Sequence, residues 1–105
     1  LVFNMIWEKT LKDYQHYLKI ERGLSLNSIS SYSNDINKLI RYLKKNEINK
    51  NPFLIENDDI QQFIYQASNE FSARSQARLI SGLRNFFDYL VFEDYRKENP
   101  TDLIE

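Results

Sequence analysis

Hydroxyl and cationic side chains recur at helical spacing in two stretches of the 105-residue chain. These side chains are Ser28, Ser31, Lys38 and Arg41 in the first stretch, and Arg74, Ser75, Arg78 and Ser81 in the second. A spacing of four residues places Arg74 and Arg78 on one face of a helix. Helix N-terminal amides, hydroxyls and guanidinium groups together favour phosphate. The two stretches are therefore candidates for binding a polyanion such as DNA, although a solvated helix face is the more usual explanation of scattered charges.

Residues suited to catalysis or metal binding are few. His16 is the only histidine, and it falls on the polar side of its helix, as a surface residue would. Asp58 and Asp59 are adjacent acids, but a place at a helix start explains them. The chain has no cysteine and only two glycines, so it offers no thiolate ligand and no glycine-rich phosphate loop. We predict no catalytic residue, no metal, no cofactor and no small-molecule substrate.

Apolar residues at intervals of three and four predict four helices and no strand. The expected helices cover residues 3–19, 26–45, 57–68 and 72–95. Gly23 suits the end of the first helix, and Ser25, Asn57 and Ser72 suit the N-caps of the other three. Pro100 stops any continuation of the last helix. The expected fold is an all-α, compact four-helix domain.

Charge is unevenly distributed along a chain whose net charge is only −1. Residues 1–50 hold 9 Lys and Arg against 5 Asp and Glu, a net charge of +4, and residues 51–105 hold 5 against 10, a net charge of −5. Within the acidic half, Arg74, Arg78 and Arg84 follow one another with no acid between them. A local basic face can therefore exist on a nearly neutral protein.

The bulk properties indicate one domain of a larger, non-membrane protein. The length fits a single domain, and no apolar run approaches the roughly 18 residues of a membrane span. The absence of cysteine suits a reducing compartment, so we expect a cytoplasmic location. No signal peptide is evident, and because the sequence starts at Leu1 rather than at a methionine, we expect it to be a piece of a longer chain.

Three stretches carry a resemblance to a known family. Residues 17–36 contain YLKIERGLSLNSISSYSNDI, residues 58–64 contain DDIQQFI, and residues 72–90 contain SARSQARLISGLRNFFDYL, followed by Asn99-Pro100. In order and spacing the chain resembles the N-terminal core-binding, SAM-like domain of tyrosine recombinases and phage-type integrases, including the Xer group. Ser28 stands where the family more often has threonine, and Gly82 stands where it usually has alanine.

The resemblance implies a core-binding domain over residues 1–98, built as two crossed helical hairpins, with residues 99–105 starting a linker. It implies that the second and fourth helices approach the major groove of double-stranded DNA. The implied contacts are Ser28, Ser31, Tyr32 and Lys38 on the second helix, and Arg74, Ser75, Arg78 and Ser81 on the fourth. Arg84 also matches, but it borders the apolar stripe and could instead hold helices together.

The family's catalytic residues belong to a following domain, so the resemblance implies no strand cleavage by this chain alone. It implies a role in DNA integration or recombination, with other recombinase subunits as partners in a synaptic complex. Two alternatives remain open from the sequence: a helical protein-interaction module that does not bind DNA, and a small enzyme domain.

Overall fold

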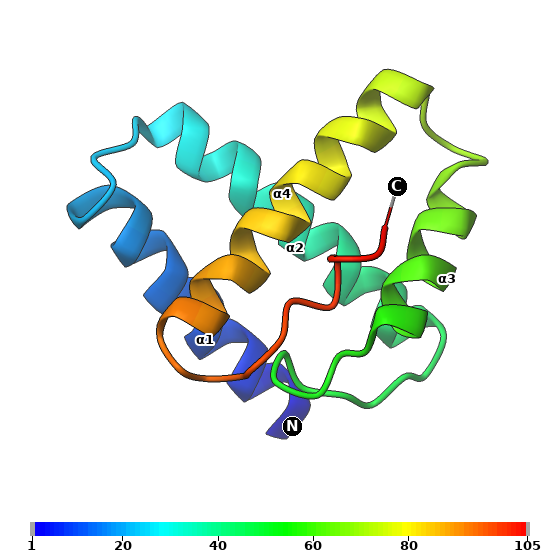
Figure 1. The fold of residues 1–105 in the computed structure, drawn as a ribbon, viewed down its shortest axis with the longest axis horizontal. Coiled ribbons are helices and arrows are strands. Elements are labelled where there is room, and N and C mark those ends of the chain that lie inside the picture. The colour runs from blue at the N-terminus through cyan, green and yellow to red at the C-terminus, as the bar shows by residue number, and fades with distance from the viewer. Residues whose placement is uncertain (1, 105) are drawn as a thin grey trace. The chain divides into compact units, whose positions relative to one another are not determined.

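Each of the four apolar periodicities forms an α-helix in the computed structural model, which describes residues 2–104 (Figure 1). The helices are α1 (Val2–Ile20), α2 (Leu26–Lys45), α3 (Asn57–Ala67) and α4 (Ala73–Phe92). No strand occurs among the described residues. The predicted all-α, four-helix fold is confirmed.

The helices belong to two compact units, each of which contains one helical hairpin. The N-terminal unit, Leu1–Pro52, contains α1 and α2, and the C-terminal unit, Phe53–Glu105, contains α3 and α4. Two hairpins were expected from the resemblance, and their crossing stays a prediction. The boundary after residue 98 also stays a prediction.

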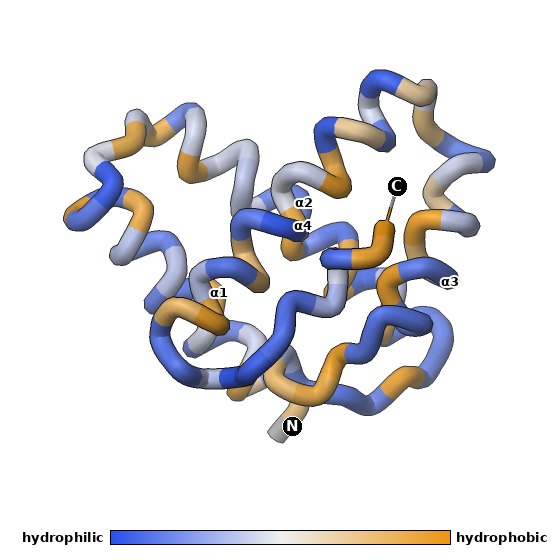
Figure 2. The backbone as a smooth tube through the Cα atoms, in the orientation of Figure 1, coloured by the Kyte–Doolittle hydropathy of each residue, from blue (hydrophilic) through white to orange (hydrophobic). Residues whose placement is uncertain are grey.

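Hydropathy alternates along every helix rather than running apolar throughout (Figure 2). Each helix therefore has one face suited to burial and one suited to water. Among the described residues, no helix combines the length and the apolar character needed to cross a membrane.

The N-terminal unit is held by aromatic packing and by side-chain hydrogen bonds between its elements. Trp7 and Tyr14 of α1 are fully buried, and the Trp7 indole nitrogen donates to the Lys50 carbonyl oxygen at 3.0 Å. Gln15 of α1 donates through Nε2 to the Ser33 hydroxyl of α2 at 2.9 Å. The polar groups of Trp7, Gln15 and Ser33 are thus paired, as burial requires, whereas the buried Oδ1 of Asn4 has no hydrogen-bond partner.

Backbone conformation at the helix ends follows the sequence in most places. Gly23 has a φ of +62° after α1, which a glycine adopts without steric cost. Ser25 is the N-cap of α2 and Ser72 is the N-cap of α4, as predicted. In each case the serine hydroxyl accepts a hydrogen bond from a backbone N–H three residues later.

Two predicted helix ends in the C-terminal unit were wrong. Glu56, not Asn57, is the N-cap of α3, because the Asp59 carboxylate accepts the Glu56 backbone N–H at 2.9 Å and closes the first turn there. Helix α4 ends at Phe92 rather than near Tyr95. Asp94 has a φ of +61°, and the Tyr95 backbone N–H donates to the Leu90 carbonyl oxygen at 2.9 Å. This pattern is a Schellman motif, which satisfies the last carbonyls and turns the chain away.

Arg96 ties the segment after α4 back to the start of the C-terminal unit. Its guanidinium donates to the Ile55 carbonyl oxygen at 2.7 Å and to the Glu98 carbonyl oxygen at 2.8 Å. It also lies 5.3 Å from the ring centre of Phe87, a cation–π contact. Burial lowers the pKa of the Arg96 guanidinium, and the Glu98 carboxylate partly offsets that effect.

Replacing Arg96 with alanine should therefore destabilise the C-terminal unit. We expect Arg96→Ala to lower the free energy of unfolding by about 2 kcal/mol, because it removes charge-assisted hydrogen bonds and leaves the buried Ile55 carbonyl unpaired. The exposed neighbour Lys97 is the control, and Lys97→Ala should change stability by less than about 0.5 kcal/mol. Denaturant unfolding of both variants checks the difference; equal losses would contradict it.

Candidate nucleic-acid interface

The candidate residues on α2 differ in how far they are exposed. Ser31 and Arg41 are exposed, whereas Ser28, Tyr32 and Lys38 are half-buried. Ser31 and Lys38 are seven residues apart, so they lie nearly in line along α2. Ser31, Tyr32 and Lys38 each have an interaction partner within the chain. Arg41 makes no hydrogen bond or ion pair with another described residue, so its guanidinium is available to a ligand.

The candidate residues on α4 form a more exposed group. Arg74, Ser75, Arg78 and Ser81 are all exposed. Spacings of four and three place Arg74, Arg78 and Ser81 on one face of the helix, and Ser75 lies about a quarter turn away. Arg78 also has an interaction partner within the chain. The structure thus brings the predicted α4 residues together at the first half of that helix.

Helices α2 and α4 begin in the same way. The Ser25 hydroxyl accepts the Ser28 N–H at 3.2 Å and donates to the Ser28 hydroxyl at 3.2 Å. Ser72 does the same with Ser75, at the same two distances. The spacing Ser-x-x-Ser was visible in the sequence, but only the capping geometry shows that the two ends match.

The first turns of these two helices contain no acid. Neither α2 nor α4 has an Asp or Glu in its first turn. By contrast, α3 has Asp58 and Asp59 there, and the Asp59 carboxylate accepts a backbone N–H at the helix start. A helix N-terminus carries a partial positive charge that attracts anions. In α3 the chain's own carboxylates offset this partial positive charge. In α2 and α4 only serine hydroxyls, which carry no charge, lie at the helix start.

Arg84 differs from the other arginines of α4 in the hydrogen bonds that it makes. It is exposed, and its Nη2 donates to the Ile104 carbonyl oxygen at 3.2 Å. Its own carbonyl oxygen accepts from Asn99 Nδ2 at 3.1 Å. Of the two roles left open by the sequence, this geometry favours holding parts of the C-terminal unit together. The contact was missed because Arg84 and Ile104 are 20 residues apart.

Other sites suggested by the sequence have no support from geometry. His16 is exposed, and the described residues contain no group of three or more His, Cys, Asp or Glu side chains able to hold a metal ion. The Asp58–Asp59 pair is explained by the helix start, as predicted.

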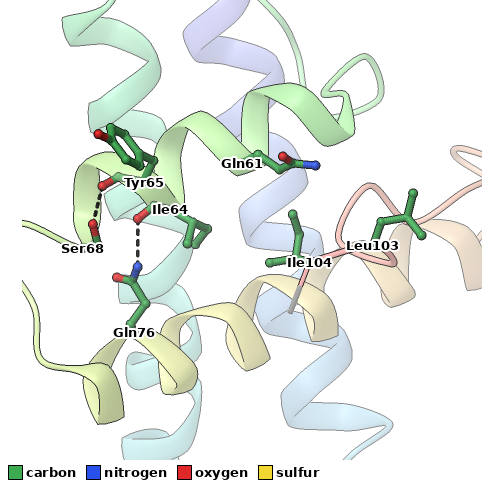
Figure 3. Close-up of a pocket in the computed structure, with 7 residues that line it drawn as sticks. All are labelled: Gln61, Ile64, Tyr65, Ser68, Gln76, Leu103 and Ile104. Atoms are coloured by element: carbon green, nitrogen blue, oxygen red, sulfur yellow. Dashed lines mark hydrogen bonds between the residues drawn. The ribbon is translucent and has the colours of Figure 1, made fainter.

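An open groove of about 450 Å³ lies in the C-terminal unit (Figure 3). Its lining contains no charged side chain and consists of Gln61, Ile64, Tyr65, Ser68, Gln76, Leu103 and Ile104. Gln76 of α4 donates to the Ile64 carbonyl oxygen of α3 at 2.8 Å across it. An uncharged groove of this kind does not favour phosphate, so it does not belong to the candidate interface.

Comparison with known proteins adds a family match. The family model "Phage integrase, N-terminal SAM-like domain" matches residues 11–94. No solved structure gives a significant match.

Curated relatives are similar over nearly the whole chain. The tyrosine recombinase XerD of Listeria monocytogenes serotype 4b (strain F2365) is 38% identical over 96 residues, which are 90% of this chain and 32% of the relative. XerD of Oceanobacillus iheyensis is 33% identical over 99 residues, 93% of this chain and 33% of the relative. The tyrosine recombinase XerC of Leptospira interrogans serovar copenhageni is 39% identical over 94 residues, 88% of this chain and 30% of the relative. The chain therefore spans about a third of the length of the curated relatives it matches.

The serine caps of the candidate interface can be tested by stability. Ser72→Ala should lower the free energy of unfolding by about 1 kcal/mol, because the first amides of α4 lose their acceptor. Ser81→Ala makes the same chemical change at an exposed site inside the helix, and it should leave stability unchanged or slightly raised, since alanine is the better helix former. Thermal or denaturant unfolding distinguishes the two, and a loss of the same size in both would refute the capping role.

Proposed function

Because the chain belongs to the phage integrase N-terminal SAM-like domain family, we propose that it is the DNA-binding N-terminal domain of a site-specific tyrosine recombinase or integrase. In this role it binds one half-site of double-stranded DNA during recombination or integration. The observation that carries the proposal is the acid-free start of α2 and of α4, each with a pair of serines, and on α4 also with Arg74 and Arg78 in the first two turns.

Phosphate contacts supply most of the proposed affinity. On α4 the guanidinium groups of Arg74 and Arg78, with the hydroxyls of Ser75 and Ser81, face one or two phosphates beyond the first turn. On α2 the corresponding groups are Ser28, Ser31, Tyr32, Lys38 and Arg41. Such contacts position the protein on the duplex, and base-edge contacts by a few of the same side chains would give sequence preference.

The parent protein is proposed to be a recombinase with a separate catalytic domain. The curated relatives carry the name tyrosine recombinase and are about three times as long as the matched region. In this proposal the residues that cleave DNA lie in the part that the relatives have and the chain does not span. The parent acts on DNA in the cytoplasm, together with other recombinase subunits in a synaptic complex.

A helical protein-interaction module without DNA binding is the second candidate. The uncharged groove favours it, because Tyr65 and Leu103 at its edge are 73% and 80% exposed. Exposed apolar side chains beside a groove are typical of surfaces that bind other proteins. The two candidates differ in the response of binding to salt.

Duplex binding should depend on salt and on the α4 arginines. We expect detectable affinity at low salt that falls steeply as salt rises, because bound phosphates release counterions. The double variant Arg74→Ala with Arg78→Ala should weaken binding and reduce the slope of log K against log salt by roughly 2. Fluorescence anisotropy titrations at several salt concentrations measure both quantities.

A charge-matched control separates specific contacts from net charge. Lys9→Ala with Lys12→Ala also removes two positive charges, from exposed positions on α1 outside the proposed interface. This control should bind DNA with nearly the wild-type salt slope. Undetectable duplex binding at low salt, or equal effects of the two double variants, would refute the proposed contact face.

The chain alone should not cut DNA. Incubated with supercoiled plasmid carrying a recombination site, it should give neither nicked circles nor a covalent protein–DNA adduct, because the proposed nucleophile lies in another domain. Gel electrophoresis under denaturing conditions detects both products. Cleavage by the purified chain would contradict the proposal that the catalytic residues lie in another domain.

A further inference from the structure

The segment that follows α4, residues 99–104, is hydrogen bonded to the rest of the C-terminal unit. Asn57 Nδ2, in the first turn of α3, donates to the Pro100 carbonyl oxygen at 2.9 Å. Arg84 Nη2 of α4 donates to the Ile104 carbonyl oxygen at 3.2 Å. Two helices thus hold the segment by side-chain donors at its two ends.

Asn99 is the centre of this arrangement. Its side chain is buried, with 7% of the residue exposed. Nδ2 donates to the Arg84 carbonyl oxygen at 3.1 Å and to Asp88 Oδ1 at 2.8 Å, both on α4. Oδ1 accepts the Thr101 backbone N–H at 2.9 Å and the Thr101 hydroxyl at 2.6 Å.

No other amino acid can replace the asparagine in this network. A carboxamide has two donor hydrogens and two acceptor lone pairs, and Asn99 uses all four. Aspartate would lose both donors and would place a second carboxylate against Asp88. Glutamine would carry the same groups one methylene further from the backbone. Thr101, which Asn99 holds, is itself fully buried.

The end of the segment follows the open groove of the same unit. Figure 3 shows Leu103 and Ile104 lining this groove with Gln61 of α3 and Gln76 of α4. Leu103 is 80% exposed although the backbone on both sides of it is hydrogen bonded, at Thr101 and at Ile104. Leu103 therefore adds no burial to the end of the segment, which is held by its hydrogen bonds, while its start at Asn99, Pro100 and Thr101 is buried.

We infer that Asn99 and Arg84 form a latch that fixes the direction in which the chain leaves the C-terminal unit. The latch holds residues 99–104 against α4, so that whatever follows residue 104 starts from a fixed point. This inference rests on the proposed function, in which a second domain acts on the same DNA. A fixed exit lowers the entropy lost when both domains engage one duplex. Arg84 is thereby a positioning residue, and Arg74 and Arg78 are left to contact phosphate.

A spin label on the segment tests the latch directly. The chain has no cysteine, so Leu103→Cys gives a single site for a nitroxide label at an exposed position. The label should show restricted motion in its electron paramagnetic resonance spectrum, similar to a label introduced by Ser81→Cys on α4. Adding Asn99→Ala should make the label mobile, so that its spectrum shows the narrow lines of a flexible tail. Adding Asn69→Ala, at an exposed asparagine of the same unit, should change nothing.

Hydrogen exchange gives a second measure that does not need the label. The Thr101 amide should exchange about tenfold faster in Asn99→Ala, the effect of losing one hydrogen bond. If Asn99→Ala fails to fold, Arg84→Ala at the exposed surface and Thr101→Val replace it, and each should still mobilise the label. A label that is already mobile in the otherwise unchanged chain, or that no variant mobilises, would overturn the latch.

DNA titration of the same variants separates the latch from the proposed function. Asn99→Ala and Arg84→Ala should keep duplex affinity within about twofold of the parent chain, as expected for changes outside the contact face. A loss with Arg84→Ala as large as with Arg74→Ala, at unchanged label mobility, would overturn the role given to Arg84. If the parent chain binds no DNA, the proposed function fails, and the label mobility still decides whether the latch exists.

Discussion

The partial positive charge at a helix N-terminus is the constraint on which this account depends. Among the described residues, three helix starts have N-caps, and these starts satisfy their first amides in two ways. Helix α3 uses the Asp59 carboxylate of its own first turn, whereas α2 and α4 use only a serine hydroxyl and have no acid there. Because hydroxyls neutralise no charge, the two 20-residue helices keep a positive end that can attract an anion. Each compact unit contains one such helix.

Side chains that bond to the backbone organise the C-terminal unit around α4. Arg96 holds the Ile55 carbonyl, and Asn99 holds α4 on one side and Thr101 on the other. These polar side chains act in place of regular secondary structure, since residues 93–104 form no helix or strand of their own. The arginines of α4 accordingly divide by contact: Arg84 bonds to the chain itself, and Arg74 makes no hydrogen bond with any described residue.

The sequence was sufficient to predict the four helices, their apolar faces and the serine caps. These features depend on residues within a few positions of each other, which a periodic pattern reveals. It was not sufficient for the N-cap of α3 or the end of α4. The start of α3 depends on which of two adjacent residues, Glu56 or Asn57, leaves the helical conformation. The end of α4 depends on Asp94, which adopts a positive φ that residues other than glycine seldom have. The hydrogen bonds from Asn99 to α4 join residues 11 and 15 positions apart, and no local pattern predicts them.

Nuclear magnetic resonance of the isotopically labelled chain, titrated with duplex DNA at low salt, tests the central claim most directly. We expect the largest amide shift changes in the first two turns of α2 and α4, including Ser28, Ser31, Arg74 and Ser75. These changes should diminish as salt is raised, while the start of α3 at Asp58 stays unchanged. Changes confined to the start of α3 or to the groove beside Tyr65, or no changes at all, would contradict the account.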